Sequence, residues 1–222
     1  MNLLNTRWLK YSFLCILLVA CTATVSNAFH YFLFWWFRPP VPAIQDVTFA
    51  DVTSNFARLR SIAITQGVGI TQNISTSLQQ DTTTPVTASV ENGGTTVSFD
   101  PIVLSSTTTT TNTNGDVIET QTDVVIIIND GDLRNTFFSA IFRTDGVATV
   151  EVTETINGTP GTPQALDPID LFVYGSIHTH GSSEYHLRAT VRGFFRQFNN
   201  GYFNYSFLSA YLNSTTPIPA TP

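Results

Sequence analysis

Residues 186–212 read HLRATVRGFFRQFNNGYFNYSFLSAYL, and they decide the fold class. Small or branched apolar residues alternate with arginine and threonine from Leu187 to Arg192, which is the period of two expected of a strand with one buried face. A second run follows Asn200-Gly201, a dipeptide that strongly marks a hairpin with a type I′ turn. The stretch therefore predicts two antiparallel strands with one face toward a core.

The rest of the body repeats this pattern of short strand-like runs between turn residues. Charged residues make up only 12% of the chain and aromatic residues another 12%, a balance that favours strands over solvated helices. The runs lie at 61–71, 86–90, 95–104, 117–128, 136–142, 147–153, 171–179, 186–198 and 202–212. The turn signals between them include Asn92-Gly93, Asn114-Gly115, Asp130-Gly131 and Asp145-Gly146. We expect an all-β fold, an antiparallel β-sandwich or barrel of about nine strands.

One segment departs from the strand pattern. Asp51 is a good helix cap, and Val52, Phe56 and Leu59 follow it at helical spacing. Residues 51–60 therefore predict one short N-terminal helix.

Composition sets the remaining boundaries of the chain. Residues 46–214 are expected to form a single β domain, in which the threonine tract at 107–113 fits either a loop or a hairpin arm. Residues 215–222 are rich in proline, so they predict a flexible tail or a short extended arm. Residues 21–45 join the aromatic run Phe29–Phe37 to a proline-rich spacer. The run predicts either a juxtamembrane segment at the lipid interface or the first strand of the core.

The first 20 residues read as an export signal. Arg7 and Lys10 form a basic start, and an apolar stretch of signal-peptide length follows them. The four residues Leu18-Val19-Ala20-Cys21 resemble the lipobox of bacterial lipoproteins. That resemblance implies that Cys21 is lipidated and begins the mature chain, which would hold the protein at a membrane by its N-terminus.

Two other readings of the leader remain open. Ser26 and Ala28 are the small residues that an ordinary signal peptidase needs, so cleavage after Ala28 is one of them. The other is an uncleaved signal anchor from Tyr11 to Phe37. All three readings place the body outside the cytoplasm, in the cell envelope, either membrane-anchored or secreted.

Charge and reactive residues exclude several classes of function. Without Arg7 and Lys10 the chain keeps 8 basic and 16 acidic residues, a formal net charge of −8, which argues against a nucleic-acid partner. Lys10 is the only lysine, and Cys15 and Cys21 are the only cysteines. The body therefore has no amine for Schiff-base chemistry and no thiol for a disulfide, a zinc–thiolate site or a nucleophile.

Three histidines and a glutamate lie within nine residues, as His178, His180, Glu184 and His186. A three-residue loop at 181–183 would set His186 opposite His178 and Glu184 opposite His180 on paired strands. Such a cluster could hold a divalent transition metal such as zinc, iron, manganese or copper. The string H-x-H-x3-E also resembles the first metal motif of cupins, which implies a double-sheet β-barrel. The alternative is a polar hairpin with surface histidines and no cofactor.

A second candidate site follows on the next strand. Arg188, Arg192 and Arg196 recur on one face, and the Asn200-Gly201 turn predicts Arg196 beside Tyr205 and Phe194 beside Phe207. The opposite face is apolar, so this one is expected to face solvent. Arginine and aromatic side chains together bind sugars, carboxylates or another protein through stacking and bidentate hydrogen bonds.

These features lead to one expectation with two alternatives. The chain is expected to be an exported, membrane-anchored β domain without enzymatic activity, acting as an envelope or surface binding or structural module. The first alternative is a cupin-like metal-binding protein or metalloenzyme that uses the histidine hairpin. The second is a subunit of an extracellular assembly that donates an extended segment to a neighbour's sheet edge.

Overall fold

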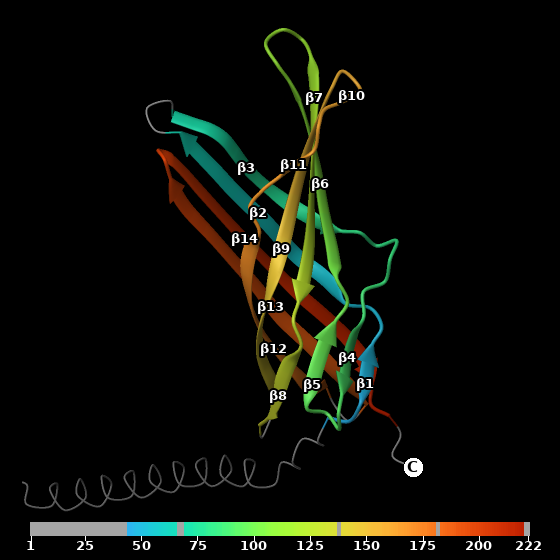
Figure 1. The fold of residues 1–222 in the computed structure, drawn as a ribbon. Coiled ribbons are helices and arrows are strands. Elements are labelled where there is room, and N and C mark those ends of the chain that lie inside the picture. Colours follow the sequence, from blue (N-terminus) through green and yellow to red (C-terminus); the bar gives the residue numbers. More distant parts are fainter. Residues whose placement is uncertain (1–43, 66–68, 137–138, 181–182, 220–222) are drawn as a thin grey trace, which may run out of the picture. The chain divides into compact units, whose positions relative to one another are not determined.

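Eight long antiparallel strands close into a ring (Figure 1). Each pairs with the next of the eight along the chain, and the last returns to pair with the first. The structure is a computed structural model that describes residues 44–65, 69–136, 139–180 and 183–219, and every regular element in these residues is a strand. The ring strands are β2 (Thr53–Thr65), β3 (Gly69–Gln80), β6 (Ile102–Thr111), β7 (Val117–Ile128), β9 (Ala140–Ile156), β12 (Ile169–His180), β13 (Glu184–Asn199) and β14 (Tyr202–Pro217).

The all-β prediction is confirmed, with a barrel-like ring rather than two stacked sheets. This up-and-down order differs from the double-sheet barrel that the cupin resemblance implies. Among the described residues, no helix is long and apolar enough to cross a membrane. The export signal, Cys21 and the aromatic run all lie outside the described residues.

Shorter strands extend the ring at its lower end in Figure 1. They are β1 (Val47–Phe49), β4 (Ala88–Glu91), β5 (Thr96–Phe99) and β8 (Gly131–Asn135), joined to β9 in the order β1-β4-β5-β8-β9. Two further short strands, β10 (Thr159–Pro160) and β11 (Gln164–Ala165), also pair with β9. β9 pairs with β8 up to Arg143 and with β7 from Gly146 onward. The predicted turn at Asp145-Gly146 is therefore wrong, because β9 runs straight through it and changes partner there.

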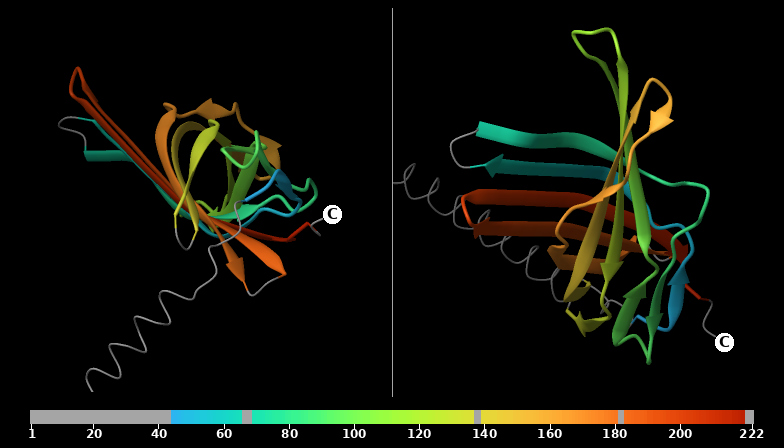
Figure 2. Two further views of the ribbon diagram at one scale, coloured as in Figure 1. Left: turned by 90° about the horizontal axis from the view of Figure 1, so that it is seen from below. Right: turned by 45° about the horizontal axis from the view of Figure 1, so that its top comes forward.

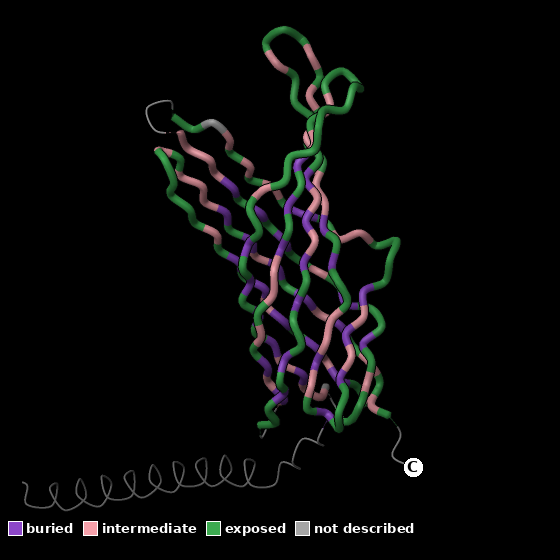
Figure 3. Tube along the Cα trace, in the orientation of Figure 1, coloured by how far each residue is buried: buried purple, intermediate pink, exposed green. Residues whose placement is uncertain are grey.

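Alternating side chains fill the inside of the ring. Buried and more exposed positions alternate along the strands (Figure 3). On β13 the residues Tyr185, Leu187, Ala189 and Val191 are almost fully buried, whereas their neighbours are more exposed. The other ring strands contribute apolar residues in the same way, including Leu59, Leu104, Val124, Val150, Val173 and Leu208. Burial of such side chains, each contributing roughly 1.5–3 kcal/mol, is the main source of stability for the ring.

The predicted helix at 51–60 is wrong, because these residues belong to β2 and the segment before it. Ala57, Leu59 and Ser61 are buried, whereas Arg58 and Arg60 are exposed. This alternation has a period of two, as in a strand. β14 pairs with β2 on one side and β3 pairs with it on the other, and both pairings stabilise the extended conformation. Phe56, which the helical interpretation placed on a buried face, is 46% exposed. Pairing with two neighbours thus overrides a weak helical pattern.

The ring opens at the end opposite the short strands. β3 pairs with β6 only at Gln79 and Gln80, opposite Ser105 and Leu104. Beyond this seam β2, β3, β13 and β14 continue together as a four-stranded arm, seen on the left of the right-hand view in Figure 2. The two strands β6 and β7 diverge from the arm as a hairpin that includes the threonine tract up to Thr111. The hairpin alternative for this tract is therefore confirmed, and β14 extends into the expected tail as far as Pro217.

Candidate binding face

The outward side of β13 carries both sequence-predicted candidate sites. His186, Arg188, Arg192, Phe194 and Arg196 lie on one face because their positions differ by even numbers. The register of β13 with β14 pairs Arg196 with Tyr205 and Phe194 with Phe207, as the turn predicts. The predicted register and outward direction of this face are therefore confirmed, whereas ligand binding by it stays a prediction.

Two further arginines join this face from β2. Ser209 of β14 lies between Arg192 and Arg58, and Phe207 lies between Phe194 and Arg60. Directly paired residues point to the same side of a sheet, so both additions face outward. Sequence reasoning missed Arg58 and Arg60 because it assigned them to a helix. We call this surface the arginine face, and define it by Arg58, Arg60, Arg188, Arg192 and Arg196 with Phe194, Tyr205 and Phe207.

The charge of the arginine face is opposite to that of the protein. Glu184, at the start of β13, is the only acidic residue in β2, β13 and β14. Its carboxylate lies 3.6 Å from Nε2 of His186, which is the one contact within 4 Å between an acidic and a basic side chain among the described side chains. The five arginines of the face thus have no carboxylate partner in the described part of the chain. A guanidinium remains protonated throughout the physiological range, so this face is positive.

Aromatic rings lie between the guanidinium groups. Phe194 and Tyr205 meet edge to face with their centroids 5.0 Å apart. The Arg196 guanidinium lies 5.5 Å from the centroid of the Phe203 ring, within the range of a cation–π interaction. Phe194 is 51% exposed and Phe198, at the tip of the arm, is 70% exposed. The face therefore offers flat apolar surfaces beside fixed positive charges.

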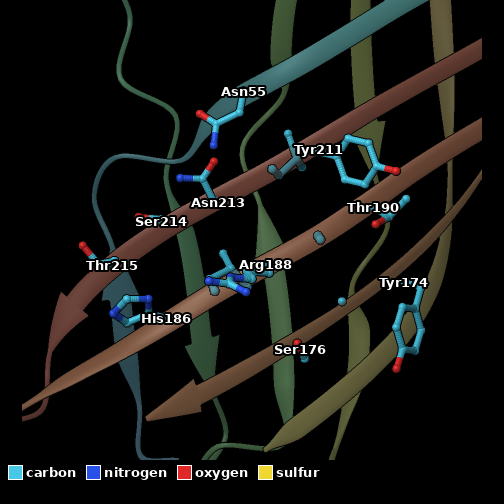
Figure 4. A pocket seen from close by; sticks show the side chains of 14 residues that line it. Asn55, Tyr174, Ser176, His186, Arg188, Thr190, Tyr211, Asn213, Ser214 and Thr215 are labelled. Carbon is cyan, nitrogen blue, oxygen red and sulfur yellow. The ribbon is translucent and has the colours of Figure 1, made fainter. Parts of the chain in front are cut away.

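A groove of about 620 Å³ lies at the Arg188 end of the face (Figure 4). Ser176 of β12 and Asn213 of β14 flank Arg188 on either side. In the next row Tyr174 and Tyr211 flank Thr190. We call this the Arg188 groove; its other lining residues include Asn55, His186 and Thr215. The two hairpin registers predicted from the sequence already imply that Tyr174, Ser176, Tyr211 and Asn213 flank β13. Sequence reasoning missed the groove because it did not extend these registers to the rows of Arg188 and Thr190.

The histidine hairpin has the register that the sequence predicts. His178 pairs with His186 and His180 pairs with Glu184, and the rings of His178 and His186 lie 5.5 Å apart. No three histidine, aspartate or glutamate side chains converge on a metal position among the described side chains, which exclude that of His180. Metal binding by His178, His180, Glu184 and His186 stays a prediction that a zinc titration of the His178→Gln variant can test.

Comparisons with known proteins do not assign a family. No protein-family model and no characterised protein matches the sequence. The structure is similar to that of Ail, the attachment invasion locus protein of Yersinia pestis, in complex with the heparin analogue sucrose octasulfate. The two chains are 6% identical and align with a TM-score of 0.39, over 78% of this chain and 100% of that one. A second structure of Ail gives 7% identity and a TM-score of 0.34, over 76% and 99% of the two chains. Similarity at this level carries no argument about function.

Proposed function

We propose that this chain is an exported, non-enzymatic surface module that binds acidic polysaccharides through the arginine face. The observation that carries the proposal is the concentration of charge. Five arginines lie on β13 and β2, the two strands on either side of β14, and none has a carboxylate partner among the described residues, although the formal net charge of the protein is −6. Such a face attracts anions although the protein as a whole does not.

The spacing of the arginines fits a polymer better than a small ion. Arg188, Arg192 and Arg196 recur every four residues, so successive guanidinium groups start about 13 Å apart along the strand. Arg58 lies two strands away from Arg192, a separation of about 10 Å. A chain with a carboxylate or sulfate on each sugar unit can meet several of these charges at once. The exposed rings of Phe194 and Phe207 supply flat surfaces for the apolar faces of the sugars.

The location of the module is part of the same proposal. The export signal delivers the body outside the cytoplasm, and lipidation at Cys21 holds it at the membrane by its N-terminus. The proline-rich composition of residues 38–42 is that expected of an extended spacer between an anchor and a domain. An anchored receptor for an extracellular polymer needs such a spacer, because the arginine face must be reachable from the outside.

Retention of the full chain on immobilised alginate tests the proposed function. We expect binding to alginate but not to neutral dextran, with salt weakening it because the contacts are ionic. The double variant Arg58→Gln/Arg192→Gln should elute at clearly lower salt. Arg134→Gln is the matched control, since Arg134 is exposed on β8 outside the face. Equal retention on dextran, or equal elution of both variants, would contradict the proposal.

A second candidate function, a subunit of an extracellular assembly, is favoured by the free edges of the arm. Within the part of the chain that the structure describes, β3 has no strand partner on its outer side from Gly69 to Leu78, and β13 has none on its outer side beyond Gly193. The exposed stretch of β3 contains no proline and no charged residue, the features that usually prevent strand addition. Size-exclusion chromatography of the full chain and of a variant without residues 29–43, which keeps the buried Ile44, tests this. A monomer in both cases would contradict assembly by strand donation.

A further inference from the structure

The Arg188 groove differs chemically from the rest of the arginine face. Arg188 is its one arginine, whereas Asn55, Ser176 and Asn213 add neutral polar groups around it. Oδ1 of Asn213 is buried and accepts no hydrogen bond among the described residues. A buried acceptor without a donor is unfavourable, so a ligand hydroxyl that donates a hydrogen bond to this oxygen would remove part of that unfavourable energy.

Two tyrosines give the groove the width of a sugar ring. Tyr174 and Tyr211 pair with Thr190 from either side, so their backbones lie two strand spacings apart, about 10 Å. Both side chains are partly exposed, at 42% and 45%, and Figure 4 shows both rings on the same side of Arg188. The small Thr190 side chain between them leaves a slot open. The Arg143 guanidinium, 5.6 Å from the centroid of the Tyr174 ring, stacks against one wall.

The polar groups around the slot are those that recognise a carboxylate. A single guanidinium satisfies a planar carboxylate with two parallel hydrogen bonds. A sulfate group presents three terminal oxygens in different directions, and Arg188 alone cannot meet them all. Glu184 does not compete for Arg188, because it lies on the far side of His186 along β13 and is paired with that side chain at 3.6 Å.

We propose that the Arg188 groove is a subsite for one carboxylated sugar ring, a hexuronate, with the carboxylate on Arg188 and the ring between Tyr174 and Tyr211. Ring hydroxyls donate to Asn213 and exchange hydrogen bonds with Ser176. This inference rests on the proposed function and deepens it: the groove selects a uronate unit, and the remaining arginines hold the polymer on either side of that unit.

Saturation-transfer NMR with the full chain tests the subsite. The probe is methyl glucuronide, and methyl glucoside is its neutral partner. We expect transfer to the glucuronide only, reduced at least tenfold in Arg188→Gln and in Tyr211→Ala. Arg188→Lys should also lose most of the signal, because it keeps the charge without the planar fork. Arg192→Gln, on the arginine face outside the groove, should keep the signal while it weakens retention on alginate.

The outcomes separate the two proposals. If the wild-type chain binds alginate but shows no transfer to glucuronide, the subsite is overturned and the polysaccharide-binding function stands. Equal transfer to glucoside, or a glucuronide signal unchanged in Arg188→Gln, also overturns it. If the chain binds neither alginate nor glucuronide, both proposals fail together. Circular dichroism of each variant shows that a lost signal does not come from unfolding, which is not expected because Arg188 and Tyr211 are exposed.

Discussion

Two inward-facing glycines make room for large side chains inside the ring. A Cβ atom on Gly193 would lie 2.5 Å from Cδ2 of Leu171, and one on Gly175 would overlap the ring of Phe142. We therefore expect Gly175→Ala to destabilise the protein by about 1–3 kcal/mol, the usual cost of overpacking. Thermal unfolding measures it, with Ser176→Ala on the outward side as the control.

A second-site change checks the cause of that destabilisation. If the added methyl group clashes with Phe142, then Phe142→Leu should lower the free energy of unfolding less in the Gly175→Ala background than in the wild-type chain. Additive losses would show that the two residues do not interact, and would place the strain elsewhere.

Tyr185 links the core to the segment before β1 through a hydrogen bond with the backbone of Gln45. The side chain is almost fully buried at the start of β13. Burial raises the pKa of its hydroxyl above 10, although a hydrogen bond from the backbone amide of Gln45 lowers it in part. The unfolded chain therefore ionises first as the pH rises, so the stabilising contribution of neutral Tyr185 is complete below about pH 10 and is lost above it.

We accordingly expect Tyr185→Phe to lower stability by about 1 kcal/mol at pH 7, through loss of the hydrogen bond. From pH 10 upward the wild-type chain should lose stability faster than this variant. Urea unfolding at pH 7 and between pH 10 and 11 measures both effects, with the exposed Tyr202→Phe as the control. Parallel curves for the two proteins above pH 10 would contradict the assignment.

The strands that sequence reasoning placed best are those whose local pattern and pairing agree. β13 alternates apolar and polar residues and ends at a strong turn, so its register with β14 follows from local rules. β2 has the same alternation over residues 57–61, but Val52 and Phe56 supplied a competing helical spacing. The pairing of β2 with β3 on one side and with the sequence-distant β14 on the other decides between them, and the spacing of apolar residues within 51–60 does not encode either pairing. That is also why Arg58 and Arg60 were missing from the predicted site.

Two turns with the same sequence allow a comparison of hairpins. Asn200-Gly201 joins β13 to β14, and Asn157-Gly158 joins β9 to the two-residue strand β10. All four residues have positive φ, for example 45° at Asn200 and 85° at Gly201, a conformation that costs a non-glycine residue about 1 kcal/mol or more. The local strain of a Gly→Ala change should be similar in the two turns.

The consequence for the protein should differ, because the strands that the turns join differ in length. β10 can fray and relieve the strain at Gly158, whereas β13 and β14 pair along their whole length and cannot. We expect Gly201→Ala to lower the unfolding temperature by a few degrees and Gly158→Ala by clearly less. Differential scanning calorimetry measures both. A larger effect at Gly158 would mean that β10 contributes more to stability than its short pairing indicates.

The closed ring depends on its shortest seam. Strand order around the ring is continuous only because β3 meets β6 at Gln79 and Gln80. Just beyond that pairing, the hydroxyl groups of Thr76 and Ser106 share a hydrogen bond of 2.5 Å. If the seam opened, the arm and the β6–β7 hairpin would separate and expose the apolar interior. The seam is therefore expected to be the first part of the ring to open, with early hydrogen exchange in β3.

A disulfide across the seam tests closure directly. The side-chain oxygens of Thr76 and Ser106 are near enough for sulfur atoms at the same positions to bond after a small adjustment. We expect Thr76→Cys/Ser106→Cys to form the bond in a full chain whose Cys15 and Cys21 are replaced by serine. Closing a loop of this length should stabilise the oxidised protein by about 3–4 kcal/mol relative to the reduced one. The reduced double variant and each single cysteine variant are the controls. Failure to oxidise would show that β3 and β6 do not meet in solution, and the arm would then be a free sheet rather than part of a ring.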